Sequence, residues 1–129
     1  MARLTKLIIA TLMLGALSSV AHADELIGEY RAYISRNDLY NSSGKRLTQP
    51  WQIIRQDRAN YHRYNIRDEG DQYDDFFASA ENRAIAERLI QHGTIERGAG
   101  ADIVRGDVYI DVKIYGRGNL GESLDVTVE

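Results

Sequence analysis

Cysteine is absent from the 129-residue chain, and proline occurs only once. Without thiols the protein forms no disulfide bond, even in an oxidising compartment, and no zinc site built from cysteines. A bacterial lipoprotein is also excluded, because no cysteine follows the apolar N-terminal run to carry the lipid. We find no proline-rich linker, internal repeat or low-complexity tract, so nothing in the sequence divides the chain into separate domains.

The longest apolar run lies at the N-terminus and ends in small residues. Arg3 and Lys6 give it a positive start, the 14 residues 7–20 carry no charge, and the tripeptide AHA follows at 21–23. A helix that spans a membrane needs roughly 20 apolar residues, so this run is too short. We therefore predict that residues 1–23 are a secretory signal peptide, cleaved after Ala23. The mature protein is then periplasmic and not membrane-anchored.

Negative charge dominates the remaining residues, 24–129. Removing Arg3 and Lys6 from the 16 basic residues leaves 14 against 19 acidic ones, a net charge of −5. This balance argues against nucleic acid or an anionic membrane surface as the main partner. The remaining length suits a single globular domain.

Alternation of apolar and polar residues predicts three strands. Residues 26–34 alternate, with the even-numbered set from Leu26 to Ile34 on one face and the odd-numbered set from Ile27 to Tyr33 on the other. Residues 107–115 and 123–128 alternate in the same way on either side of a glycine-rich reversal. The last two strands therefore form a hairpin with one apolar face, on which Ile110 and Val112 are expected to be among the most buried residues.

Two helices are predicted between the first strand and the hairpin. The first begins near Thr48 and Pro50 and places Trp51, Ile54, Arg58 and Tyr61 at helical spacing. The second begins near Ser79 and stops at Gly93. The predicted fold class is α+β: a small antiparallel sheet, made of the N-terminal strand and the C-terminal hairpin, with two helices packed on one face.

The segment 56–77 combines a histidine and arginines with many acidic residues, and it allows two interpretations. Calcium takes oxygen ligands, and Asp68, Glu69, Asp71, Asp74 and Asp75 could supply them. The spacing does not fit the EF-hand pattern, however. We therefore favour a solvated acidic connector that pairs with neighbouring arginines, namely Arg63 and Arg67, and we predict no bound metal and no cofactor.

Histidine chemistry is the other possibility in this segment. His62 and His92 with one carboxylate could form a three-ligand zinc site, although a histidine in the last turn of a helix is explained by the helix dipole. As a catalytic base, His62 could be oriented by Asp57 or Asp68 and activate a serine, Ser42 or Ser43. A pair of carboxylates could also serve a hydrolase, but such pairs are recognised by their separation in space, which the sequence does not give. The alternative function is therefore a small periplasmic hydrolase that uses His62 with Asp57 or Asp68. The simpler interpretation places His62 at a partly exposed edge, bonded to a carboxylate.

The polar face of the predicted sheet is the preferred binding surface. Tyrosine and arginine are enriched at interfaces, because they combine a large contact area with a polar group. The residues that we predict to contact a ligand or partner are Arg31, Tyr33, Tyr109, Lys113 and Tyr115, with Glu29 and Asp111 between them. An ordinary solvated face has a similar composition. The leading functional prediction is an exported, non-enzymatic binding module whose partner is an unidentified protein or envelope ligand.

The signal peptide gives the first testable prediction. Protein recovered from the periplasm should begin at Asp24 when its N-terminus is sequenced, because the small residues before this position fit signal peptidase. Intact Met1 on a cytoplasmic protein would contradict the prediction.

Overall fold

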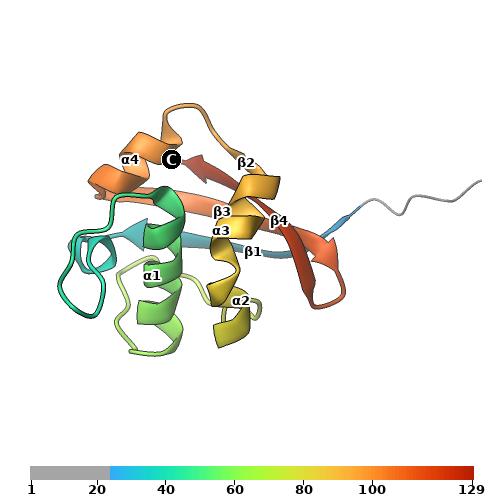
Figure 1. The fold of residues 1–129 in the computed structure, drawn as a ribbon, viewed down its shortest axis with the longest axis horizontal. Coiled ribbons are helices and arrows are strands. Elements are labelled where there is room, and N and C mark those ends of the chain that lie inside the picture. The colour runs from blue at the N-terminus through green and yellow to red at the C-terminus, as the bar shows by residue number, and fades with distance from the viewer. Residues whose placement is uncertain (1–23) are drawn as a thin grey trace, which may run out of the picture.

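A computed structural model of the protein describes residues 24–129, and the predicted signal peptide lies outside the described residues. This part of the chain is an α+β fold with a four-stranded mixed sheet and four α-helices (Figure 1). The strands lie in the order β1-β3-β4-β2. Their bounds are β1 Glu25–Ile34, β2 Thr94–Ile95, β3 Val108–Arg117 and β4 Leu120–Val128.

The three long strands are antiparallel, as predicted, but the complete sheet is mixed. β1 pairs with β3, and β3 pairs with β4 in the C-terminal hairpin. The short strand β2 pairs in parallel with β4, through Thr94 and Ile95. The prediction of a purely antiparallel sheet is therefore wrong at this edge, because two residues are too few to show a period in the sequence.

One face of the sheet forms the floor of the core. Its side chains are buried: Tyr30, Ala32, Ile34, Ile110, Val112, Ile114, Leu124 and Val126. Ile110 and Val112 have no exposed surface, which confirms the predicted alternation. We call the opposite side the outer face, which carries Glu29, Arg31, Tyr33, Tyr109, Asp111, Lys113 and Tyr115, all half-buried or exposed.

The alternation of β1 breaks at its start. The pairing shifts between Leu26, which lies opposite Tyr115, and Gly28, which lies opposite Ile114. As a result Leu26 is 51% exposed, whereas Ile27 packs against the core. From the alternation we expected the reverse, with Leu26 on the inner face and Ile27 on the outer face. The prediction is wrong here because a β-bulge adds one residue and reverses the alternation beyond it.

Helix α1, Pro50–His62, matches the first predicted helix and buries Ile53 and Ile54 in the core. Its N-cap is Gln49, one residue later than the predicted Thr48. Proline occupies the first turn, where its missing N–H has no helical partner to lose.

The second predicted helix is present but interrupted. Ser79 caps its start by accepting a hydrogen bond from the Asn82 amide, at 3.3 Å. The chain then leaves helical geometry at Ile85, which separates α2, Ala80–Ala84, from α3, Ala86–His92. The break turns α3 so that Ala86 and Leu89 become buried. Ala84, the last residue of α2, is exposed.

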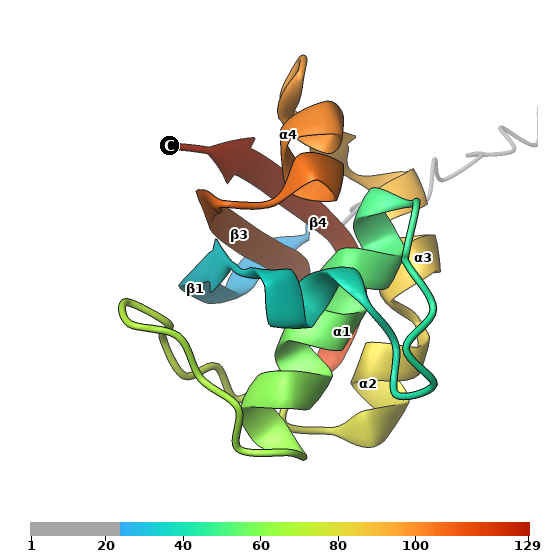
Figure 2. The same cartoon turned by 90° about the vertical axis from the view of Figure 1, so that its left-hand side faces the viewer.

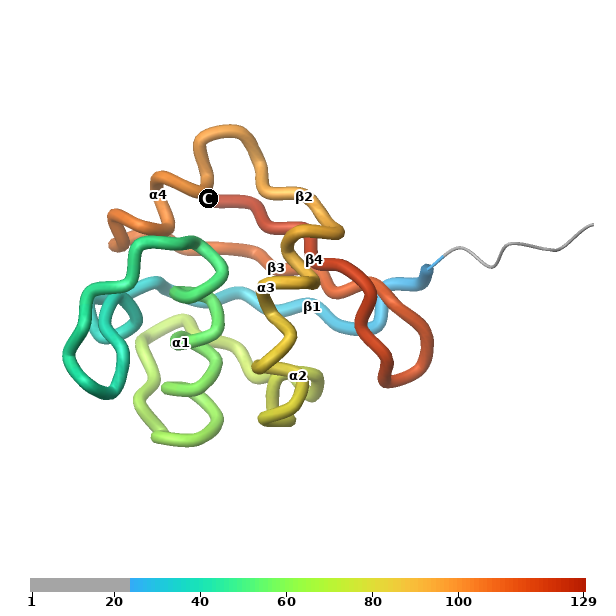
Figure 3. Tube along the Cα trace, viewed as in Figure 1, coloured from blue at the N-terminus to red at the C-terminus, as the bar shows by residue number. Residues whose placement is uncertain are grey.

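Besides β2, two short elements were not predicted. A 3-10 helix, η1, covers Arg36–Leu39, and a helix of seven residues, α4, covers Ala99–Arg105 between Gly98 and Gly106. Buried side chains of α1, α3 and α4 form one hydrophobic cluster with the inner residues of the sheet. Figure 2 shows these helices beside the strands, and the trace in Figure 3 follows the connection from α1 to α2 past β1.

Within residues 24–129, no helix is long and apolar enough to cross a membrane.

Gly93 is expected to tolerate no side chain, because a Cβ there would lie 1.7 Å from the Leu124 carbonyl oxygen. Gly93→Ala should therefore lower the free energy of unfolding by about 1–3 kcal/mol or more. Gly100→Ala is the matched control, because its Cβ meets only Pro50, at 3.5 Å, and alanine favours helix α4. Thermal unfolding measures both changes. Equal melting temperatures for the two variants would contradict this close packing of Gly93 on β4.

Candidate functional site

The connector between α1 and α2 lies along the free edge of β1. The Asp71 carboxylate accepts a hydrogen bond from the Tyr33 amide at 2.8 Å, and the Gln72 side chain accepts one from the Arg31 amide at 2.9 Å. The Gln72 amide donates to the Arg31 carbonyl, also at 2.9 Å. These three bonds occupy backbone groups that an edge strand otherwise exposes. The connector thus acts as a partial fifth strand.

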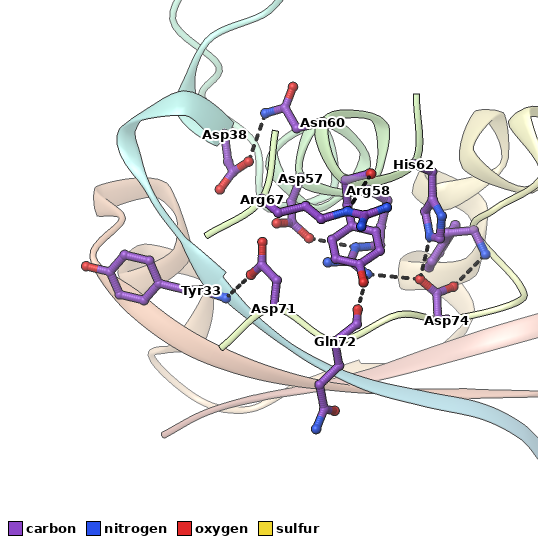
Figure 4. A network of polar contacts seen from close by, with 12 residues as sticks. Tyr33, Asp38, Asp57, Arg58, Asn60, His62, Arg67, Asp71, Gln72 and Asp74 are labelled. Atoms are coloured by element: carbon purple, nitrogen blue, oxygen red, sulfur yellow. Dashed lines mark hydrogen bonds and ion pairs between the residues drawn. The ribbon is translucent and has the colours of Figure 1, made fainter. Parts of the chain in front are cut away.

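A buried arginine holds the connector in this position (Figure 4). Arg58 on α1 has no exposed surface. Its guanidinium donates to Asp57 at 2.7 Å, to Asp74 at 2.9 Å and to the Gln72 carbonyl at 2.9 Å. It also lies over the ring of Tyr30, 4.1 Å from the centroid. One side chain therefore connects the helix, the connector and the sheet.

Burial and neighbouring charges have opposite effects on the pKa values in this network. Burial raises the pKa of Asp57 well above its usual value, and the neighbouring Arg58 cation works in the other direction. Burial is the largest influence on Arg58 and acts to lower its pKa, but Asp57, Tyr30 and the hydrogen bonds to Asp57 and Asp74 together outweigh burial, so the pKa is raised. Because a guanidinium keeps its proton in proteins, Arg58 is charged where it donates to Asp57 at 2.7 Å. The network is therefore ionic and almost completely removed from solvent.

His62 belongs to the same network, but not with the predicted partners. Its Nε2 lies 2.9 Å from Asp74 Oδ1, and its side chain is only 5% exposed. Asp57 instead binds Arg58, and the Asp68 amide donates to the Asp71 carboxylate at 2.8 Å. The structure thus pairs His62 with a carboxylate, as the simpler interpretation expected, but the side chain is more buried than predicted.

The predicted nucleophiles do not join His62. Ser42 and Ser43 are exposed in the turn after η1. The ring of His62 contacts Tyr61 and Tyr73 instead, with centroids 5.0 and 5.5 Å away. Across the described part of the chain, Asp74 is the partner to which the His62 ring is hydrogen-bonded. His92 is exposed at the end of α3, in the last turn, as predicted.

The acidic residues of the connector bind protein groups rather than surrounding a cation. Within residues 24–129, no three histidine, cysteine, aspartate or glutamate side chains are arranged to hold a metal ion. Asp71 binds two backbone amides, and Asp74 binds Arg58, His62 and the Phe77 amide. Asp75 is exposed.

The prediction of a solvated connector is therefore wrong for its central residues. Asp74 is only 5% exposed. The two arginines expected to pair with the carboxylates instead lie over tyrosine rings, Arg63 over Tyr64 and Arg67 over Tyr61, at 5.1 and 4.1 Å. Tyr64 itself is 41% exposed.

A third buried carboxylate, Asp38, connects η1 to α1. Asp38 is 1% exposed, accepts a hydrogen bond from the Ser35 amide at 2.9 Å, and accepts another from Asn60 at 2.9 Å. Burial raises the pKa of Asp38 to about 6, although these hydrogen bonds act to lower it. The carboxyl group therefore titrates in a range where ordinary aspartates are fully ionised.

The outer face carries the predicted binding residues in an ordered arrangement. The Arg31 guanidinium grips the Glu129 carboxylate with contacts of 2.7 to 3.0 Å and lies 3.7 Å above the centroid of the Tyr109 ring. Tyr33 packs on the same ring, with the centroids 4.9 Å apart. Lys113 and Tyr115 line a separate hollow of about 190 Å³. The predicted binding residues thus lie on one face of the sheet. Arg31, Tyr33 and Tyr109 form a stacked cluster there, and Lys113 and Tyr115 line a hollow.

Sequence reasoning missed Arg58 and Asp74 as the centre of the polar network. One signal was visible, because Arg58 is the single polar residue among the helical positions that include Ile54 and Tyr61. An arginine in an apolar stripe requires a buried carboxylate. Which of the acidic residues supplies it depends on the path of the connector.

Comparisons with family models, with curated proteins and with solved structures find no match to this chain.

Asp38 gives a prediction for the pH dependence of stability. Its pKa is about 6 when folded and 3.8 as the reference value, so over that interval the folded state holds a proton that the unfolded state has lost. Protonated Asp38 therefore contributes fully to the free energy of unfolding below pH 3.8. This contribution, about 3 kcal/mol, is lost as the pH rises from 3.8 to about 6. Asp38→Asn should remove this part of the fall in denaturant unfolding measured at several pH values.

The control for this experiment is Glu122→Gln, which changes an exposed carboxylate. Asp57 and Asp71 also have raised pKa values, because of burial, so Asp38→Asn should keep a smaller decline of the same sign. If the wild type and Asp38→Asn decline equally, Asp38 does not titrate in this window.

Proposed function

We propose that the protein is an exported, non-enzymatic binding module of the bacterial cell envelope, which acts in the periplasm after its signal peptide is cleaved. The outer face is its binding surface, opposite the inner sheet residues that cluster with buried side chains of the helices. The partner is a protein segment that carries basic side chains. The stacked cluster of Arg31, Tyr33 and Tyr109 is the observation that carries the proposal.

The cluster is ordered before any partner arrives. Arg31 is held between Glu129 and the Tyr109 ring, and the Tyr109 hydroxyl donates to the Glu69 carbonyl of the connector at 3.3 Å. Gly70 supports this contact, because its backbone has a φ of +91° and lies close to the Tyr109 ring. Side chains fixed on strands lose little conformational freedom on binding. Preordered aromatic and arginine side chains of this kind are typical of interface anchors.

The charges beside the cluster favour a basic partner. Arg31 lies opposite Asp111 in the sheet, but its guanidinium binds Glu129 instead. Burial raises the pKa of Asp111, and the adjacent Glu29 carboxylate raises it further, whereas Lys113, opposite Glu29 in the sheet, lowers it. Two neighbouring carboxylates repel each other, and a cation between them relieves the repulsion. A lysine or arginine from a partner would supply that cation.

A short peptide of alternating arginine and serine is a suitable probe of this surface. Fluorescence anisotropy should detect binding to the purified protein that weakens as salt is added, because the attraction is electrostatic. Combining Glu29→Gln with Asp111→Asn should weaken binding about tenfold. The melting temperature should change little, because both side chains lie on the outer face.

The matched control combines Glu81→Gln with Glu87→Gln, which remove the same charge from exposed positions on α2 and α3. This pair should leave the affinity unchanged. Equal losses for the two pairs would mean that only the net charge attracts the peptide. Such a result, or no loss with either pair, would contradict the proposed surface.

A further inference from the structure

A hollow of about 330 Å³ lies between η1, the turn after it and the C-terminal half of α1. Figures 1 and 2 both show this turn beside α1, which η1 also contacts. Its chemistry is set by one arginine, four amide side chains and two tyrosines: Arg36, Asn37, Asn41, Gln56, Asn60, Tyr40 and Tyr64. The volume lies at the lower end of the range for small-molecule sites, about 300–1,000 Å³, and suits a single ring. We call this hollow the amide cleft.

One wall of the amide cleft is fixed by the buried side chain of Asn60. Its Nδ2 donates to Asp38 at 2.9 Å and to the Asn37 carbonyl at 3.2 Å. With Nδ2 directed at two acceptors, Asn60 Oδ1 must face Gln56, whose Nε2 donates to it at 2.9 Å. Gln56 is therefore held in one orientation, with its Oε1 left for another donor. The Asn60 side chain is thus bonded through both its nitrogen and its oxygen, which fixes this wall.

Arg36 gives the amide cleft its charge. Within residues 24–129 no carboxylate lies at ion-pair distance from the guanidinium, whose recorded contact is the Tyr40 ring at 5.7 Å. The residues that line the cleft include no aspartate or glutamate. In a domain with an excess of acidic residues, this combination favours an anionic ligand. A guanidinium binds a carboxylate through two parallel hydrogen bonds.

The amides in the cleft offer both donors and acceptors. Asn41 accepts from the Ser43 and Lys45 amides through Oδ1, at 3.0 and 2.9 Å, which directs its Nδ2 elsewhere. Gln56 offers the acceptor described above. Hydroxyl groups both donate and accept, so they match this mixture better than a purely anionic or purely apolar ligand does.

Tyrosines complete the lining. Tyr40 is half-buried and Tyr64 is 41% exposed, with Ile66 beside it at 44%. Exposed aromatic rings pack against flat apolar surfaces, and the C–H face of a sugar ring is such a surface. These residues form the apolar part of a site whose other parts are polar and cationic.

We propose that the amide cleft binds a sugar that carries a carboxylate. Arg36 binds the carboxylate, the amides of Asn41 and Gln56 bind ring hydroxyls, and the two tyrosines contact the ring. The cleft shares no lining residue with the outer face, so this ligand is separate from the basic partner proposed above. Each of the two proposals can fail while the other stands.

Galacturonate, galactose and acetate separate the parts of the proposal. In titrations followed by amide chemical shifts, galacturonate should shift residues of η1, the following turn and α1 in a saturable way. Galactose, which lacks the carboxylate, should bind the same residues about tenfold more weakly. Acetate, which lacks the ring, should bind more weakly than galacturonate.

The decisive variant is Arg36→Gln, with Arg88→Gln as the control that removes the same charge from an exposed site on α3. Arg36→Gln should lower the affinity for galacturonate about tenfold, to that of galactose, and leave galactose binding unchanged. Tyr64→Ala should weaken both sugars. Arg88→Gln, and the outer-face pair Glu29→Gln with Asp111→Asn, should change neither sugar.

Three results would overturn the proposal. The first is that galacturonate causes no saturable shift in the amide cleft. Acetate could bind as tightly as galacturonate, which would make the site a simple anion site. The two sugars could bind the wild type equally, which would remove Arg36 from recognition. Because Arg36 and Tyr64 are exposed, their variants should fold, and unchanged amide spectra outside the cleft verify this.

Discussion

The charge of Arg58 is the constraint on which the arrangement of this domain depends. Moving a guanidinium out of water costs several kcal/mol unless carboxylates and other acceptors surround it. Asp57 is adjacent in sequence and supplies one of them, but Asp74 and the Gln72 carbonyl come from the connector. Burying α1 against the sheet therefore requires the connector to fold back over the arginine. The path of the chain after α1 follows from this requirement.

That path determines what happens at the edge of the sheet. Once Gln72 and Asp74 lie against Arg58, Asp71 and Gln72 are within reach of the β1 backbone and satisfy it. The residues before them, Glu69 and Gly70, then meet Tyr109 on the outer face. A charge buried under α1 is thus linked, over a few residues, to the order of the proposed binding surface. Two carboxylates of the connector, Asp71 and Asp74, thus serve backbone amides and the buried Arg58.

The parts of this fold that follow from local periodicity could be predicted. The inner faces of β1 and β3 follow from alternation, and the limits of the second helical segment follow from Ser79 and Gly93. The bulge near Leu26, the break at Ile85 and the short helix α4 could not be predicted in the same way. They depend on packing between distant segments, and seven or fewer residues are too few for a distinct period.

The candidate sites also divide into parts that follow from local periodicity and parts that depend on contacts between distant segments. The outer-face residues were found because alternation alone assigns a side chain to a face. The connector was misjudged because a solvated acidic loop and a loop bonded to backbone amides have the same composition, and only burial separates them. The amide cleft was not predicted, since its residues, from Arg36 to Ile66, are brought together by the contact of η1 with α1.

The buried polar network is not needed to stabilise the core, and this suggests that it has a functional role. Replacing a buried ion pair by apolar residues is often neutral or stabilising, so a network of this kind is weak support for stability alone. Arg58 fixes the connector beside the outer face, and Asp38 with Asn60 fixes η1 beside the amide cleft. Each buried charge lies behind one of the two surfaces that we propose to bind ligands. We infer that the buried polar groups serve to hold these surfaces in a single conformation, which an apolar core of the same volume would leave unspecified.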